Sequence, residues 1–102
     1  MIKENLTRAE IDSAITSGTS LLYFYSKNCG PCLVTQKIME QISSEYNATI
    51  FKVDSDIETK WTKELSITSI PMTFLVKDGQ ILNKIVGLTS KHEFVKMISQ
   101  YL

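Results

Sequence analysis

Residues 20–32 read SLLYFYSKNCGPC and contain two patterns in succession. The first seven residues are almost continuously apolar and aromatic, which is typical of a strand covered on both faces in the middle of an α/β sheet. The CGPC segment at 29–32 breaks this pattern. Apolar residues then recur every four positions, at Val34, Ile38, Ile42 and Tyr46. This spacing predicts a helix from about Pro31 to Glu45, with the proline in the first turn, where its missing N–H costs nothing.

The segments on either side supply further predicted elements. Thr7 and Glu10 have the Ser/Thr-x-x-Glu form of a capping box, so we expect a helix that starts there and ends at Gly18. Residues 49–53 form a short apolar strand pattern. A short helix should follow, with an inner stripe of Ile57, Trp61 and Leu65.

The last third of the chain predicts a hairpin and a helix. A strand at 72–76 and a strand at 81–86 flank Asp78-Gly79, a signal for a tight hairpin turn. A second capping box starts at Ser90, and the inner face of the helix behind it comprises Phe94, Val95, Ile98, Tyr101 and Leu102. Strand–helix–strand units imply parallel pairing, and the hairpin adds an antiparallel edge. The predicted class is therefore α/β, with a mixed sheet covered on both faces.

Length and charge limit the organisation and the partners. A chain of 102 residues with 43% hydrophobic residues fits one domain, residues 1–102. The 11 basic residues balance the 11 acidic ones, which argues against nucleic acid as a partner because phosphate binding needs a basic excess or patch. No stretch approaches the ~18–20 apolar residues of a membrane span, and no leader-like core precedes residue 7. We therefore expect a cytoplasmic monomer that does not bind membranes.

The position of Cys29 and Cys32 predicts redox chemistry. A helix N-terminus carries about half a positive charge, so it should stabilise the Cys29 thiolate and hold the pKa of that thiol below the free value of about 8.5. Cys32 lies one turn further into the helix and should be buried. Cys29 would attack a disulfide of another protein, and Cys32 would then attack Cys29 and release the reduced client. Gly30 and Pro31 would set the relative stability of dithiol and disulfide.

Three other interpretations of the cysteine pair compete with this one. A structural disulfide that closes so few residues removes little chain entropy and would stabilise the fold poorly. A structural zinc ion requires four ligands, and beyond the cysteines the one further soft candidate in the sequence is His92. Two inert core cysteines would not account for the Gly-Pro between them or for the strand-to-helix position. We therefore predict a redox pair and no metal site.

From about Leu21 to its end the chain resembles the thioredoxin family. The resemblance rests on the CGPC motif, on Ser69-Ile70-Pro71 opening a strand, on Asp78-Gly79 in the hairpin and on Val86-Gly87 before the last helix. It implies a thioredoxin fold of four to five strands and about four helices, with no dissociable cofactor. It implies protein disulfides as clients and an NADPH-linked thioredoxin reductase as the source of electrons. In the family the equivalent of Pro71 is cis and packs against the cysteines, the backbone of Ile70 pairs with the client, and the backbone next to Gly87 lines the client groove.

Several positions depart from the family pattern. Asn28 replaces the usual Trp before the first cysteine, and Leu33 replaces the usual Lys after the second. Tyr23 replaces a buried Asp that in the family helps to deprotonate the second cysteine, and Ile50 is expected to replace the usual Lys partner of that Asp. Tyrosine, with a free pKa near 10, is a poor base at neutral pH. We therefore expect a slower resolving step and a narrower or different set of clients.

Two other functions remain open at this stage. The same cysteine pair could function as a disulfide oxidase or isomerase with a more oxidising reduction potential. Alternatively, the groove beside Ile70 and Pro71 could bind a partner without catalysis, as in a thioredoxin-fold adaptor. By the resemblance, Gly-Pro between the cysteines favours the reducing direction, and an intact cysteine pair argues against an adaptor.

Overall fold

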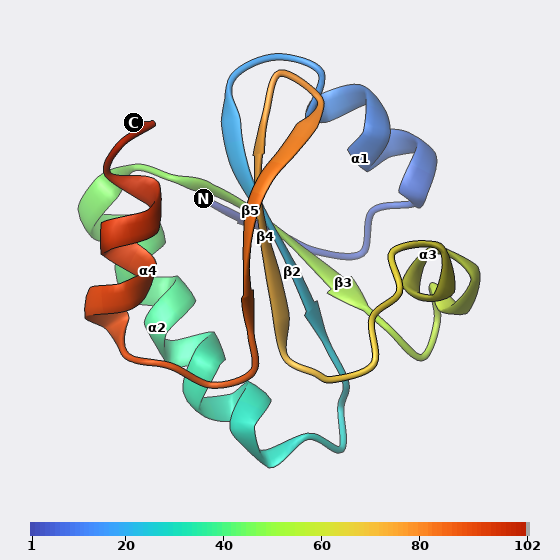
Figure 1. Ribbon diagram of the computed structural model, residues 1–102. Helices are drawn as coiled ribbons and strands as arrows, with labels where there is room; N and C mark the ends of the chain where they lie inside the picture. Colours follow the sequence, from blue (N-terminus) through green and yellow to red (C-terminus); the bar gives the residue numbers. More distant parts are fainter. Residues whose placement is uncertain (102) are drawn as a thin grey trace.

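A five-stranded mixed sheet forms the centre of the computed structural model, which describes residues 1–101 (Figure 1). The elements are β1 (Ile2–Lys3), α1 (Arg8–Ala14), β2 (Thr19–Tyr25), α2 (Gly30–Tyr46), β3 (Thr49–Asp54), α3 (Thr59–Glu64), β4 (Met72–Lys77), β5 (Gln80–Val86) and α4 (Lys91–Ile98). The spatial order of the strands is β1-β3-β2-β4-β5. β1, β3 and β2 are parallel, whereas β4 runs antiparallel to both β2 and β5. The predicted α/β class and mixed sheet are confirmed.

Helices cover both faces of the sheet. Figure 1 shows α2 and α4 together on one face and α1 and α3 on the other. The core divides accordingly, because successive side chains of a strand point to opposite faces. Leu22 and Phe24 of β2 pack with the α1 and α3 side, and Leu21 and Tyr23 pack with the α2 and α4 side. All four side chains are buried, which confirms that β2 is a central strand.

The helix that follows the cysteines differs in detail from its prediction. It spans Gly30–Tyr46, close to the predicted bounds. Its buried residues are Cys32, Thr35, Met39 and Ile42. Val34 and Tyr46, predicted on the inner face, are 48% and 38% exposed. Thr35 takes the inner position instead of Val34, since its hydroxyl donates a hydrogen bond to the Pro31 carbonyl oxygen (3.1 Å) and is thereby satisfied.

Three smaller predictions need correction or extension. Strand β1 was not expected, because two residues show no periodicity; it forms by pairing Ile2 with Ile50 at the sheet edge. Helix α1 ends at Ala14, four residues before Gly18. Ile57 was predicted on the inner stripe of α3, but it precedes that helix and is 71% exposed.

The inner face of helix α4 agrees with its prediction in part. Phe94 and Ile98 are buried as predicted, whereas Val95 and Tyr101 are half-buried. The predicted inward position of Leu102 lies outside the described residues. Within residues 1–101, no helix has the length and apolar character needed to cross a membrane.

Candidate active site

The two cysteines lie where β2 ends and α2 begins, as predicted. They form a disulfide, with their Cα atoms 5.2 Å apart. Cys29 is the N-cap of α2, and its Sγ accepts a hydrogen bond from the Cys32 backbone N–H (3.2 Å). Pro31 lies in the first turn, where it removes no helical hydrogen bond. The 17-residue helix therefore directs its positive N-terminal end at the sulfur of Cys29.

Burial distinguishes the two sulfurs. Cys32 is 3% exposed, whereas Cys29 is half-buried. A sulfur of another protein can therefore reach Cys29 much more easily than Cys32. The arrangement allows Cys29 to be attacked from outside and Cys32 to react with Cys29 from within.

Three segments far apart in the sequence meet beside Cys29. The Ile70–Pro71 peptide bond is cis, as the resemblance implies. The Ile70 carbonyl oxygen lies 3.8 Å from the Sγ of Cys29. The Gly87 backbone N–H donates a hydrogen bond to the Pro71 carbonyl oxygen (2.8 Å), and Gly87 has a φ of +76° that favours glycine. The structure thus brings Cys29, Ile70, Pro71 and Gly87 together.

Tyr23 lies beneath the disulfide and contacts the backbone of the second cysteine. Its hydroxyl donates a hydrogen bond to the Cys32 carbonyl oxygen (2.9 Å). Burial raises the pKa of Tyr23 to about 12, and the neighbouring Tyr25 adds to the shift. The phenol therefore stays protonated at neutral pH. It can hold the first turn of α2 in place, but it cannot serve as the base for Cys32.

The strand register corrects the residue that was expected opposite Tyr23, which is a lysine and not Ile50. Residue 23 is paired with Lys52 on β3, whereas Ile50 is paired with Leu21. Lys52 and Tyr23 also line one cavity of about 240 Å³ together with Cys32. The Lys52 side chain is 18% exposed, and its Nζ lies 4.4 Å from the centre of the Tyr25 ring. Sequence reasoning missed Lys52 because the register between β2 and β3 is not visible in either strand alone.

The remaining predicted residues lie on the surface around the disulfide. Asn28 is exposed, and its backbone N–H donates to the Ser26 hydroxyl (3.4 Å). That hydroxyl donates in turn to Asp56 (2.8 Å), which ties the loop before Cys29 to the turn after β3. Gly30 is also exposed, and Leu33 next to Cys32 is 70% exposed. Polar Asn28 and apolar Leu33 therefore flank the cysteine pair on its outer surface.

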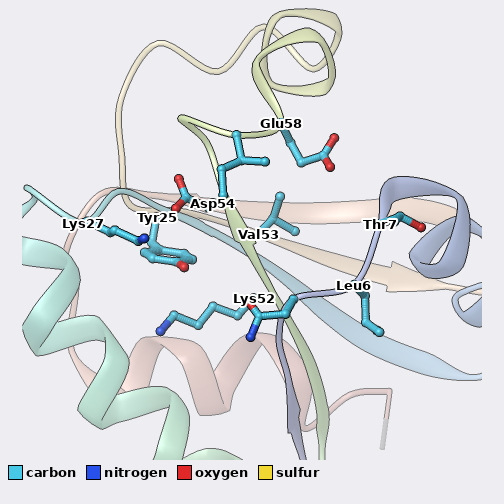
Figure 2. A pocket seen from close by; sticks show the side chains of 10 residues that line it. Leu6, Thr7, Tyr25, Lys27, Lys52, Val53, Asp54 and Glu58 are labelled. Carbon is cyan, nitrogen blue, oxygen red and sulfur yellow. The ribbon is translucent and has the colours of Figure 1, made fainter.

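A second cavity, of about 300 Å³, lies on the other side of Tyr25. It shares Tyr25, Lys27 and Lys52 with the cavity beside Cys32 and continues to Asp54 and the start of α1. Figure 2 shows Lys52 extending beneath the Tyr25 ring in this region. Within residues 1–101 no three His, Cys, Asp or Glu side chains gather into a group that could hold a metal ion.

The comparisons with known proteins agree with this geometry. The family model for thioredoxin matches residues 3–100. The chain belongs to the thioredoxin family. A thioredoxin of Staphylococcus aureus is 31% identical to it over 99 residues, which cover 95% of either chain. Thioredoxins are protein-disulfide oxidoreductases, so this chain is a thiol–disulfide oxidoreductase with a redox-active cysteine pair.

Solved thioredoxin structures are also similar to this one. The oxidised mitochondrial thioredoxin 3 of Saccharomyces cerevisiae has a TM-score of 0.86 at 28% identity and covers 97% of this chain and 94% of its own. A thioredoxin variant of Halobacterium salinarum has a TM-score of 0.91 at 23% identity and covers 98% of this chain and 89% of its own. The predicted thioredoxin fold is confirmed. Thioredoxins act on protein disulfides and are typically reduced by thioredoxin reductase.

Proposed function

We propose that this chain reduces protein disulfides, with Cys29 as the nucleophile and Cys32 as the resolving thiol. The Cys29 thiolate attacks one sulfur of the client disulfide, and the other client sulfur leaves as a thiolate. Cys32, as its thiolate, then attacks the Sγ of Cys29, and the second client sulfur leaves. The client gains two electrons and this chain becomes the disulfide. The observation that carries the assignment is the difference in burial, since Cys29 is half-buried and Cys32 is 3% exposed.

We further propose that the client binds as an extended chain along Ile70, Pro71 and Gly87. The Ile70 carbonyl oxygen lies 3.8 Å from Cys29 Sγ, so a strand paired with this backbone would bring its cysteine next to the reacting sulfur. The hydrogen bond from the Gly87 N–H to the Pro71 carbonyl oxygen holds these two segments next to each other. An NADPH-linked thioredoxin reductase would return the two electrons, and the chain would act as a cytoplasmic monomer without a dissociable cofactor.

We infer from the surface around Cys29 that this chain acts on a narrower or different set of partner proteins than a general thioredoxin does. An exposed Asn28 stands where the family usually has a tryptophan, and Leu33, 70% exposed, stands where it usually has a lysine. A partner that relies on contact with the aromatic ring loses apolar burial here. A partner with an apolar segment beside its disulfide gains contact with Leu33.

The test is a comparison with an ordinary thioredoxin. We expect the chain to accelerate insulin reduction by dithiothreitol, but to be recycled by a bacterial thioredoxin reductase about tenfold less efficiently than the reference, a difference of about 1.4 kcal/mol in transition-state binding. The measurement is kcat/KM from NADPH consumption. Asn28→Trp should recover part of the loss, and Lys37→Met on the exposed side of α2 serves as the matched surface control.

Each alternative gives a different result in this comparison. No acceleration of insulin reduction would support an adaptor and overturn the enzyme assignment. Recycling at the rate of the reference thioredoxin would leave the enzyme assignment intact and overturn the proposal of a narrower partner set.

A further inference from the structure

The cavity drawn in Figure 2 lies at the carboxyl ends of the parallel strands β1, β3 and β2. Helix α2 follows β2 on one face of the sheet, and α3 follows β3 on the other face (Figure 1). A crevice at such a change of face is where open α/β sheets commonly bind ligands. The volume of about 300 Å³ is at the lower end of the range for small-molecule sites. Neither cysteine is among its described lining residues, so this cavity is separate from the reacting sulfurs.

Two pairs of opposite charges line this cavity. The cations are Lys27 and Lys52, and the anions are Asp54 and Glu58. Figure 2 shows both lysines beside the Tyr25 ring and Glu58 on a separate part of the wall. Within residues 1–101 no ion pair joins one of these cations to one of these anions. Complementary charges that surround one cavity without pairing can bind a molecule that carries both signs.

Glu58 and Lys27 are the charges most available to a ligand. Glu58 is the N-cap of α3, but its side chain makes no capping hydrogen bond, and among the described residues it forms no ion pair. Lys27 is exposed and likewise forms no ion pair in that part of the chain. Asp54, in contrast, accepts a backbone hydrogen bond (2.9 Å), and Lys52 has a contact with Glu4 (3.6 Å). A ligand can therefore engage Glu58 and Lys27 without displacing a partner.

Apolar side chains line the same cavity. They belong to Leu6, Val53 and Ile57. Ile57 is 71% exposed, whereas isoleucine is among the residues most often buried. A ligand in the cavity would cover part of this side chain, and removing that apolar surface from water would favour binding. The cavity is therefore suited to a ligand that has an apolar part as well as two opposite charges.

We propose that this cavity binds a small zwitterionic peptide of about dipeptide size with an apolar side chain. The peptide carboxylate contacts Lys27 and Lys52. The peptide ammonium group contacts Glu58 and Asp54, and the apolar side chain packs on Ile57. In a free amino acid both charged groups are attached to one carbon atom, whereas a dipeptide separates them by a peptide unit, which suits charges on separate parts of the wall. This site is additional to the disulfide exchange proposed above and does not depend on it.

Binding is measured on the ¹⁵N-labelled oxidised protein with alanyl-leucine as the probe. We expect saturable shifts in two-dimensional NMR spectra for the backbone amides of Tyr25, Lys52 and Ile57. The expected Kd is about 1 mM, an affinity typical of so small a ligand. The absence of saturable shifts up to about 20 mM, well above that Kd, would overturn the proposal. Shifts confined to Cys29 and Gly87 would place the dipeptide in the client groove and would also overturn it.

Three altered peptides test which groups of the ligand are recognised. N-acetyl-alanyl-leucine lacks the ammonium group, and alanyl-leucine amide lacks the carboxylate. Each should bind about tenfold more weakly, because each loses its charge-assisted hydrogen bonds. Glycyl-glycine keeps both charges but has no apolar side chain, so it should also bind more weakly than alanyl-leucine. Equal affinity for all four peptides would contradict the proposed recognition.

Glu58→Gln tests the protein side of the same contact. It removes the charge at nearly constant shape and should weaken alanyl-leucine about fivefold, since Asp54 remains. The affinity for N-acetyl-alanyl-leucine should not change, because that peptide has no ammonium group, whereas a merely structural defect would weaken both peptides. Glu40→Gln on the exposed side of α2 is the matched control and should bind like the parent.

Ile57→Ala provides a second test, at a position whose exposure makes a folding defect unimportant. It should weaken alanyl-leucine about threefold through lost apolar contact and leave glycyl-glycine unaffected. Parent affinity for alanyl-leucine in both Glu58→Gln and Ile57→Ala would overturn the proposal. An equal loss for alanyl-leucine and its N-acetyl form in Glu58→Gln would overturn the role of that carboxylate and with it the proposed zwitterion site.

Discussion

Cys29→Ser is expected to abolish disulfide reduction, and Cys32→Ser to accumulate a stable mixed disulfide with the client. The half-buried sulfur of Cys29 is the one a client can reach, so without it no exchange begins. Without Cys32, which is 3% exposed and bonded to Cys29, the first exchange occurs but nothing releases the client. The measurements are insulin turbidity for turnover and non-reducing electrophoresis with mass spectrometry for the trapped complex.

The double variant with both cysteines replaced by serine is the matched control and should capture nothing. Turnover by Cys29→Ser at the parent rate would contradict the mechanism. Capture of clients through Cys32 in the Cys29→Ser variant would reverse the two roles.

Phe24→Ala is expected to cause the largest loss of stability among single core substitutions near the site. Phe24 is fully buried in β2, and its ring packs edge-on against Trp61 (5.3 Å between centroids) and Phe74 (5.9 Å). Removing a buried phenylalanine side chain costs about 3–5 kcal/mol, a large part of the 5–15 kcal/mol that stabilises a typical domain. Urea unfolding of the oxidised protein should show this loss in the free energy of unfolding.

Ile57→Ala is the matched control on the same side of the sheet. Ile57 is 71% exposed, so its substitution should change the free energy of unfolding by less than about 0.5 kcal/mol. A cost of several kcal/mol at Ile57 together with a small one at Phe24 would contradict the burial described for both positions.

The sequence predicts the centre of this molecule well, for physical reasons. A continuously apolar strand such as β2 is stable in the middle of a sheet that is covered on both faces. Leu21 to Phe24 are buried in that position. The cysteine pair follows β2 closely in the sequence, so the prediction of the strand also predicts that the pair lies at the start of α2. Pro31 in the first turn agrees with that position. These features are local, and short-range patterns are sufficient to predict them.

Other features could not be predicted from short-range residue patterns alone. The cis peptide before Pro71 was expected from the family resemblance, since residue patterns alone allow either isomer. Ile50 was expected opposite Tyr23, but Lys52, two residues further along, occupies that position, because register depends on the whole strand pair. Ile57 matched a helical spacing but lies before the helix begins. The cavity beside Cys32 combines residues of β2, β3 and α2, so no sequence window contains it.

The reduction potential of the Cys29–Cys32 pair tests the central claim most directly. The account of a disulfide reductase predicts a value near −270 mV when the protein is equilibrated with a glutathione buffer series and the dithiol fraction is measured. A potential of about −200 mV or higher would mean that the dithiol is favoured and the disulfide is the better oxidant. That result would contradict the reducing direction and support the oxidase or isomerase function for the same cysteine pair.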